Sequence, residues 1–181
     1  MLELNGSFGR RVLAITGAHA HVEDVESVIR KVRKISRANE VVSQIFNAKH
    51  IAGRQHLIHA ARLALIAQED GRNFADSQSI ELTCWTAGLR QINQALERVG
   101  LRKGSAEVAI LTIGGKEEKV KKAREEILHE LGAKQDEGVL DLTPEKEPTL
   151  IRDFGISESE LEVANLQSLV LERVALLSLE R

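Results

Sequence analysis

The chain has 181 residues, 43% of them hydrophobic and 29% charged, a composition that fits one globular domain with a terminal appendage. Its 25 basic and 27 acidic side chains give a formal net charge of −2, which excludes a wholly basic nucleic-acid coat protein but not a local basic face. The single cysteine excludes a disulfide framework and a cysteine zinc site, and an aromatic content of 3% argues against paired aromatic stacking on a strand.

Strand and helix signals alternate along the first part of the chain. Apolar runs bounded by turn residues predict three strands, over residues 12–18, 41–46 and 108–113. The third run is apolar on both faces, which favours a central place in the sheet. Apolar residues at helical spacing predict five helices, over residues 25–35, 57–65, 77–85, 89–99 and 117–131. The expected fold class is α/β or α+β: a small mixed β-sheet packed with several helices, plus a long C-terminal helix.

The charge balance changes after residue 133. Residues 134–181 carry five basic and eleven acidic side chains, and the two prolines of the chain, Pro144 and Pro148, stand near the start of this part. Proline lacks a backbone donor and disfavours helix in the residue before it. We therefore expect a core domain over residues 1–133, an acidic proline-containing linker over 134–156 with a short strand at 139–142, and a C-terminal partner-docking helix over 157–181.

The predicted C-terminal helix begins with a capping box, in which Ser157 and Glu160 satisfy each other's backbone amides. Roughly 20 residues follow, apolar over most of the helix circumference, so the helix needs cover on more than one side. That cover is either its own core or a partner protein. Glu172 and Arg173 interrupt the apolar run and argue against a membrane anchor. The N-terminus lacks the layout of a secretory signal, and we expect a cytoplasmic protein.

Motifs for catalysis or cofactor binding fail when their spacing is checked. Residues 113–116 read IGGK, but Ile110 stands where a phosphate-binding loop needs another glycine. His56 and His59 share a helix face without an acidic third ligand, which argues against zinc. Cys84 lies beside a tryptophan in an apolar run and is expected to be a small buried thiol. The sequence therefore predicts neither an enzyme nor a bound cofactor or metal.

Basic and histidine side chains gather between residues 49 and 103. Those around the helix over 57–65 and its ends are Lys49, Arg54, His56, His59, Arg62 and Arg72. Arginine presents forked donors that suit phosphate, so this group fits a small nucleic-acid or anion site. A solvated helix face explains the same residues equally well, and both interpretations stay open.

Two stretches carry a resemblance to a known family: GRQHLIHAARLAL at 53–65 and GRNFADSQSIELTCWTAGLRQINQALERVGL at 71–101. They resemble the PRPK-binding protein (TPRKB-like) family, the small regulatory subunit of the archaeal and eukaryotic KEOPS complex, and the match is to the archaeal type. The triplet Arg90-Gln91-Ile92 before an alanine and a glycine is the most specific part. Two departures are Gln55, where the family more often has an acidic residue, and the longer acidic linker.

The resemblance implies a function that composition does not. The family's complex adds a threonylcarbamoyl group to the tRNA adenosine that follows the anticodon. The implied role of this chain is a noncatalytic regulatory subunit that binds the kinase/ATPase subunit, the tRNA 3′ CCA tail and, indirectly, the remaining KEOPS subunits. The alternative is a pure protein–protein adaptor without direct RNA binding, and a third reading is a small-molecule enzyme with an unrecognised pocket.

The resemblance also suggests site residues. The expected tRNA-binding residues are Lys49, Arg54, His56, His59, Arg62, Arg72 and Arg90. The expected kinase-binding residues are Leu166, Leu169, Val170, Arg173, Val174 and Leu177. Ile92 is expected in the core, Arg90 either as a buried hydrogen-bond hub or as a tRNA contact, and Glu81 paired with an arginine.

Overall fold

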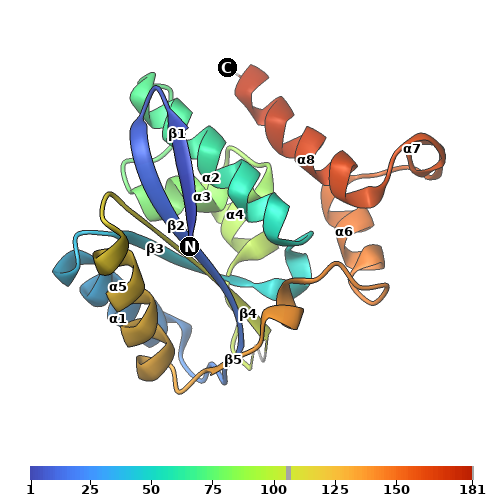
Figure 1. Ribbon diagram of the computed structural model, residues 1–181. Coiled ribbons are helices and arrows are strands. Elements are labelled where there is room, and N and C mark those ends of the chain that lie inside the picture. Colours follow the sequence, from blue (N-terminus) through green and yellow to red (C-terminus); the bar gives the residue numbers. More distant parts are fainter. Residues whose placement is uncertain (105–106, 181) are drawn as a thin grey trace. The chain divides into compact units, whose positions relative to one another are not determined.

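The computed structural model describes residues 1–104 and 107–180, so Arg181 of the predicted docking helix lies outside the described residues. These residues form an α+β fold, as predicted (Figure 1). The chain divides into two compact units, each made of two separate segments. The first comprises Met1–Ala48 and Leu101–Val139, and the second comprises Lys49–Gly100 and Leu140–Arg181. The predicted linker and C-terminal helix thus fall mostly in a unit with residues 49–100, and not in separate parts.

The first unit contains a five-stranded sheet in the described residues. Its strands are β1 (Leu2–Gly6), β2 (Gly9–His19), β3 (Val42–Asn47), β4 (Glu107–Gly114) and β5 (Lys134–Gln135). The order is β1-β2-β4-β3, with β5 also paired to β2. Every pairing is antiparallel, so the prediction of a mixed sheet is wrong. The reason is that β4 lies between β2 and β3 and runs opposite to both, which leaves no parallel strands as neighbours. The central place predicted for β4 is confirmed.

Two helices cover one face of this sheet. Helix α1 (Val25–Ala38) begins where the Asp24 carboxylate accepts the Ser27 amide, and α5 (Glu117–Glu130) packs beside it (Figure 1). Val32 of α1 and Ile127 of α5 meet alternate residues of β4, Val108 and Ile110, in one hydrophobic cluster. The residues of β4 that face this cluster lie two apart, and those of α1 follow helical spacing. Both patterns are the ones from which the sequence predicts these elements.

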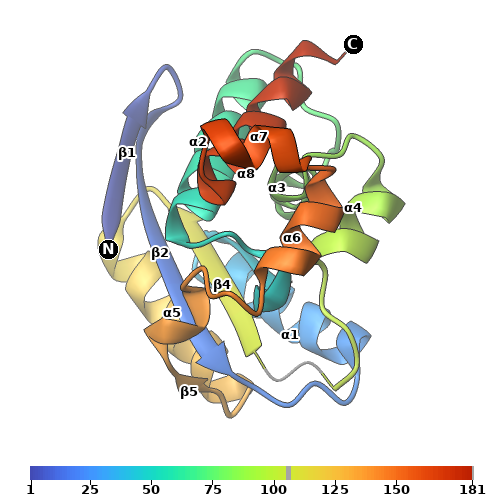
Figure 2. The same ribbon diagram turned by 90° about the vertical axis from the view of Figure 1, so that its right-hand side faces the viewer.

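The second unit is helical in the described residues. It contains α2 (Arg54–Glu69), α3 (Gln78–Ala87), α4 (Ile92–Val99), α6 (Glu147–Phe154), α7 (Glu158–Val163) and α8 (Leu166–Leu176). Helix α2 packs against α3 and α8, and α6 packs against α8 (Figure 2). Gly88 ends α3 with φ of 63°, a backbone conformation that suits glycine, and so turns the chain toward α4. No helix among the residues described is long and apolar enough to span a membrane.

The C-terminal segment is not one long helix. The predicted capping box is present: Ser157 Oγ accepts the Glu160 amide, and Glu160 accepts the Ser157 amide at 2.8 Å. However, Ala164 adopts extended backbone, and Asn165 starts α8 by accepting the Ser168 amide at 2.9 Å. An asparagine side chain competes with the helix backbone in this way, and it divides the predicted helix into α7 and α8.

The predicted linker is largely ordered into secondary structure. The strand expected at 139–142 is wrong, because Glu137–Leu140 forms a 3-10 turn. Helix α6 follows, with Pro148 in its first turn. The missing amide hydrogen of proline costs nothing there, since the first turn of a helix has no partner for it. Pro148 therefore helps to begin a helix within the segment that the sequence predicts to be a linker.

Candidate functional site

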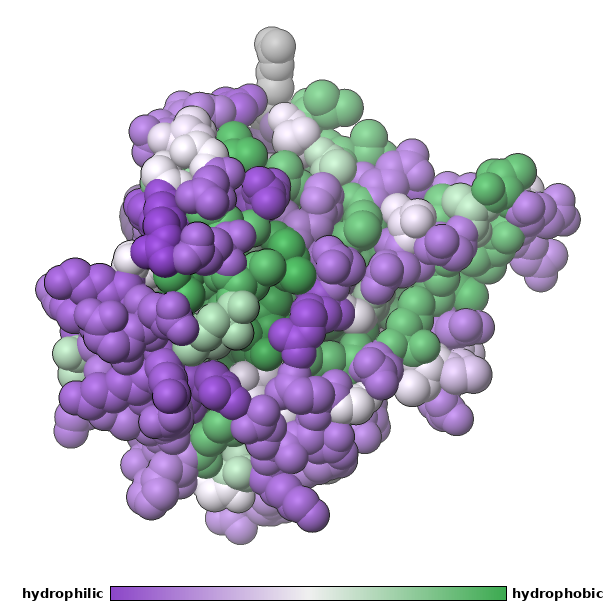
Figure 3. All heavy atoms as spheres, in the orientation of Figure 1, coloured by the Kyte–Doolittle hydropathy of each residue, from purple (hydrophilic) through white to green (hydrophobic). Residues whose placement is uncertain are grey.

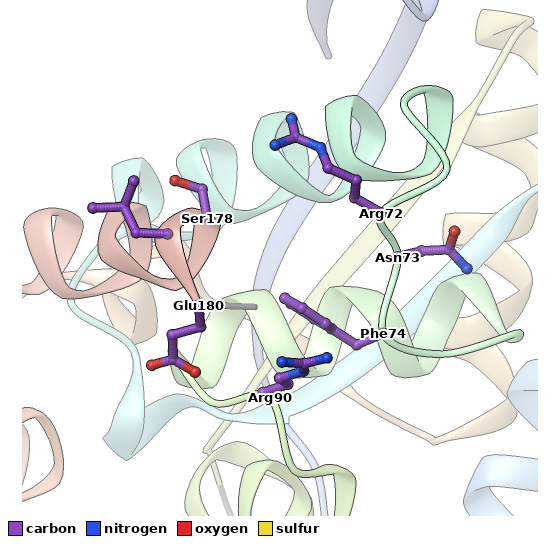
Figure 4. Close-up of a pocket in the computed structure, with 7 residues that line it drawn as sticks. Arg72, Asn73, Phe74, Arg90, Ser178 and Glu180 are labelled. Atoms are coloured by element: carbon purple, nitrogen blue, oxygen red, sulfur yellow. The ribbon is translucent and has the colours of Figure 1, made fainter.

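An open pocket of about 810 Å³ lies in the second unit. Three segments form it: the loop between α2 and α3, the turn after α3, and the last turn of the chain, Leu177–Leu179, with the residue that follows it (Figure 4). Its lining residues are Arg72, Asn73, Phe74, Arg90, Ser178, Leu179 and Glu180. Two of the predicted tRNA-binding residues, Arg72 and Arg90, thus meet at one site. Sequence reasoning missed the other residues of this pocket.

Phe74, which lines this pocket, belongs to an aromatic stack. The rings of Phe74 and Trp85 are stacked, with centroids 5.5 Å apart and planes at 29°. The guanidinium carbon of Arg90 lies 5.5 Å from the Phe74 centroid, within the range of a cation–π contact (Figure 4). Arg90 is exposed, so the expected buried hydrogen-bond hub is wrong. The pocket therefore offers a guanidinium and an aromatic ring side by side.

The carboxylate of Glu81 fixes this stack in place. Glu81 is 3% exposed, and its oxygens accept the amides of Phe74 at 2.7 Å and Ala75 at 2.9 Å. They also accept the indole N–H of Trp85 at 2.8 Å. The expected pairing of Glu81 with an arginine is wrong, because its carboxylate oxygens accept hydrogen bonds from three N–H groups instead. One buried side chain thereby joins the Phe74 backbone to the Trp85 indole, the two residues whose rings stack.

Charges of both signs stand at the rim of the pocket. Arg72 contacts the Asp70 carboxylate at 2.6 Å, and both side chains are exposed, so this pair is weak and open to competition by an anion. Glu180 adds a carboxylate on the opposite side, from the last turn of the chain (Figure 4). A smaller hollow adjoins the pocket and shares Arg72, Phe74, Ser178 and Glu180 with it; its other lining residues are Leu63, Ile66, Ala67, Trp85 and Leu177. The site therefore combines apolar and charged side chains.

His56 belongs to the core and does not reach the surface. Its side chain is fully buried, Nδ1 accepts the Ala52 amide at 3.0 Å, and Nε2 donates to the Thr86 carbonyl at 2.7 Å. Burial lowers the pKa of His56 to about 4, so the ring is neutral. A neutral ring with both nitrogens bonded inside the protein cannot bind a phosphate, which corrects its place among the expected tRNA contacts.

The remaining predicted basic residues do not form one site with Arg72 and Arg90. Arg54 is the first residue of α2, and Arg72 lies beyond the end of that helix. Sixteen helical residues span about 24 Å, so these two positions are far apart. Lys49, Arg54 and Arg62 are exposed. His59 is partly buried, and desolvation lowers its pKa.

The apolar residues expected to bind the kinase lie inside the second unit. Leu166, Leu169, Val170, Val174 and Leu177 are each at most 6% exposed. The sequence leaves open whether the protein's own core or a partner covers these residues. Helices α2 and α6 of the same unit pack against α8 and cover them. In α8 and the turn that follows it, the large apolar residues that are exposed are Leu176 at 45% and Leu179 at 74%.

Two further expectations concern single side chains. Arg173, the sixth residue expected to bind the kinase, is held within the unit: it donates to the Phe154 carbonyl at 3.1 Å and to Glu160 at 2.6 Å. Ile92 is 39% exposed, so its expected place in the core is wrong.

Cys84 is fully buried, as predicted, and desolvation, with Glu81 nearby, raises its pKa to about 11. Such a thiol stays protonated and is a poor nucleophile.

Within residues 1–104 and 107–180, no group of three or more histidine, cysteine, aspartate or glutamate side chains is placed to hold a metal ion.

Comparison with known proteins places the chain in a family. The family model described as Kinase binding protein CGI-121 matches residues 19–178, which include all lining residues of the pocket except Leu179 and Glu180. A comparison with curated proteins gave no match. The match covers most of the chain and agrees with the resemblance of residues 53–65 and 71–101 to the TPRKB-like proteins. The chain therefore belongs to the CGI-121 family of kinase-binding proteins.

Proposed function

We propose that this protein is a noncatalytic regulatory subunit of the KEOPS complex, which binds the kinase/ATPase subunit and the 3′ CCA end of tRNA. The family match supports the kinase partner. The pocket formed by Arg72, Phe74 and Arg90 supports RNA binding and is the observation on which this part of the proposal rests.

The chemistry of the pocket suits the end of a single strand. Unpaired nucleotides expose both faces of their bases, and proteins bind them by stacking on aromatic rings and guanidinium planes. Phe74 and Arg90 present both kinds of surface next to each other. Arg72 at the rim can exchange Asp70 for a phosphate, since both are exposed. One nucleotide on the Phe74 ring, with its phosphate near Arg72, is the arrangement that we propose.

For the kinase, we propose a surface built on the exposed leucines of the C-terminal segment. Leu176 and Leu179 are three residues apart and lie on the same side of the helical turn. Hydrophobic atoms reach the surface in the region of α7 and α8 (Figure 3). Exposed leucines near a polar rim are typical of protein–protein contacts.

The test of RNA binding is a titration of full-length tRNA and of tRNA lacking the CCA tail. We expect the full-length tRNA to bind more tightly, with a log–log salt slope of roughly −1.4 to −2.1 for two or three neutralised phosphates of a single strand. The double variant Arg72→Glu/Arg90→Glu should remove the difference between the two tRNAs. Arg54→Glu/Arg62→Glu changes the charge equally, at the first residue and in the middle of α2, and should preserve it.

The adaptor alternative makes a different prediction for the same titration. A pure adaptor does not bind RNA directly, so full-length and tail-less tRNA should give the same result and the Arg72→Glu/Arg90→Glu variant should not change it. Kinase binding should be retained by this variant in either case, so the measurement separates an RNA-binding subunit from an adaptor.

A further inference from the structure

A stripe of like charge runs along the exposed side of α1 in the first unit. Arg30, Arg33, Lys34 and Arg37 are spaced at i, i+3, i+4 and i+7, which places them on one face of the helix. All four are exposed. We call these four residues the α1 basic stripe.

The stripe lies opposite the buried side of the helix. Val32 and Ser36 face the core, with exposures of 5% and 7%. The fifth basic residue of α1, Lys31, points sideways and pairs with Glu130 of α5 at 3.0 Å. Contact with the neighbouring helix therefore accounts for Lys31 but not for the α1 basic stripe.

The pattern differs from an ordinary solvated helix face. The stripe contains four neighbour pairs at i, i+3 or i, i+4, and every pair joins two cations, which destabilises a helix. On α5 acidic and basic residues follow each other from one turn to the next, and Lys122 lies 3.8 Å from Glu126 one turn later. On the side of the stripe, the one acidic residue of α1 is Glu26, in the first turn. A protein with a net charge of −2 thus concentrates cations on one helix. Their mutual repulsion destabilises that helix, and binding of an anionic partner would offset this repulsion.

We propose that the α1 basic stripe binds the phosphate backbone of double-helical RNA. From Arg30 to Arg37 the helix rises about 10 Å, a length over which a duplex carries about six phosphate charges. Three of the four cations are arginines, whose forked donors match phosphate oxygens. The exposed side has one large apolar residue, Ile29 at 37%, too little to anchor the helix in a lipid surface. The choice of RNA rests on the proposed function, but the stripe is in the other unit from the tail pocket.

The decisive variant is Arg33→Glu/Lys34→Glu. It turns all four repulsive pairs of the stripe into attractive ones, so α1 should become at least as stable while its local charge falls. The matched control is Lys121→Glu/Lys122→Glu, which reverses two adjacent exposed cations on α5. The probe is a blunt RNA hairpin without a single-stranded tail, so failure of the tail pocket does not affect the result.

We expect the wild-type protein to bind the hairpin with a log–log salt slope of about −2.7, as for three neutralised duplex phosphates. The stripe variant should lose at least about tenfold in affinity at low salt and have a smaller slope, with Tm unchanged or raised, while the control stays within about twofold. Equal affinity of the stripe variant and the control for the hairpin overturns the proposal. So does a polyglutamate peptide that binds the wild-type protein as tightly as the hairpin, because the stripe would then prefer acidic polypeptides.

Discussion

At the scale of single residues, buried polar side chains determine what the pocket can do. Glu81 is surrounded by N–H donors and holds Phe74 and Trp85 in one stack. His56 joins Ala52, before α2, to Thr86 near the end of α3. Neither side chain is a candidate contact for a partner, yet both fix the segments that present Phe74 and Arg90.

The first prediction concerns the ring of Phe74. Phe74→Ala should weaken binding of full-length tRNA by about 1–3 kcal/mol, because it removes the surface on which a base would stack. Phe74→Tyr keeps the ring and should bind nearly as the wild type does. The measurement is a tRNA titration, with Tm as the check on folding. Equal affinities of the alanine and tyrosine variants would mean that the ring does not contact RNA.

The second prediction concerns the pH dependence of stability. The folded protein keeps His56 neutral down to about pH 4, whereas the unfolded chain takes up a proton near the ordinary pKa of 6.5. The unfolded state therefore binds more protons between these values, and the free energy of unfolding should fall by up to about 3 kcal/mol as the pH decreases through this window. The lowered pKa of His59 acts in the same direction.

Urea unfolding at several pH values tests the role of His56. Its variant His56→Gln can still accept from Ala52 and donate to Thr86, but it does not titrate. We expect a shallower loss of stability between pH 6.5 and about 4 in this variant. The same slope in both proteins would assign the pH dependence to other groups.

At the scale of elements, the C-terminal segment has two sides with different roles. Val170 and Val174 pack into the second unit, so a charge at either position should unfold that unit and cannot report on a partner. Leu176 and Leu179 are exposed and are free of this problem.

The third prediction uses these exposed leucines. Leu176→Glu/Leu179→Glu should weaken kinase binding at least about tenfold, because hot-spot leucines lose their apolar contact and a carboxylate would be buried. The control is Val163→Glu on α7, an apolar residue at the other end of the segment that is 85% exposed, against 45% for Leu176 and 74% for Leu179. Both variants should keep the wild-type Tm. Unchanged kinase affinity of the double variant would move the interface away from this end of the chain.

The elements also show how far the sequence can be read. Helix α1 is predictable because its apolar residues recur at helical spacing, and strand β4 because it is a continuous apolar run that is buried on both faces. Strand β1 was missed because Leu4 alone of its residues is buried, which gives no pattern. The sequence does not predict helix α6, because proline disfavours helix in the residue before it and Pro148 stands in the first turn of this helix. The division of the last helix depends on a single capping side chain, Asn165, within an apolar run.

The pocket was beyond sequence reasoning for a different reason. Phe74 stands alone among polar loop residues, and its importance comes from a stack with Trp85 eleven positions later. Ser178 and Glu180 reach the same pocket from the end of the chain. Contacts between residues so far apart in the sequence leave no periodic pattern in it. Arg72 is identified from the cluster of basic residues, and Arg90 from the family resemblance; neither shows that the two side chains line one pocket.

At the scale of the whole molecule, the fourth prediction concerns activity. The purified protein alone should neither modify tRNA nor hydrolyse ATP, because its single thiol is buried and protonated and its family is described by kinase binding. Added to the remaining KEOPS subunits, it should raise the rate of threonylcarbamoyl transfer. Turnover by the isolated chain would contradict the proposal and favour an enzyme with an unrecognised pocket.

The division of the chain into interleaved segments has a consequence for how the protein is made. The chain leaves the first unit at Ala48 and returns at Leu101, and β4, the central strand, belongs to the returning segment. Until β4 has left the ribosome, the edges of β2 and β3 that it will join stay unpaired and open to association with other chains. Sheet formation must then close a loop of some fifty residues, a nonlocal step that slows folding. Completion of the first unit during synthesis is therefore delayed until more than half of the chain has emerged.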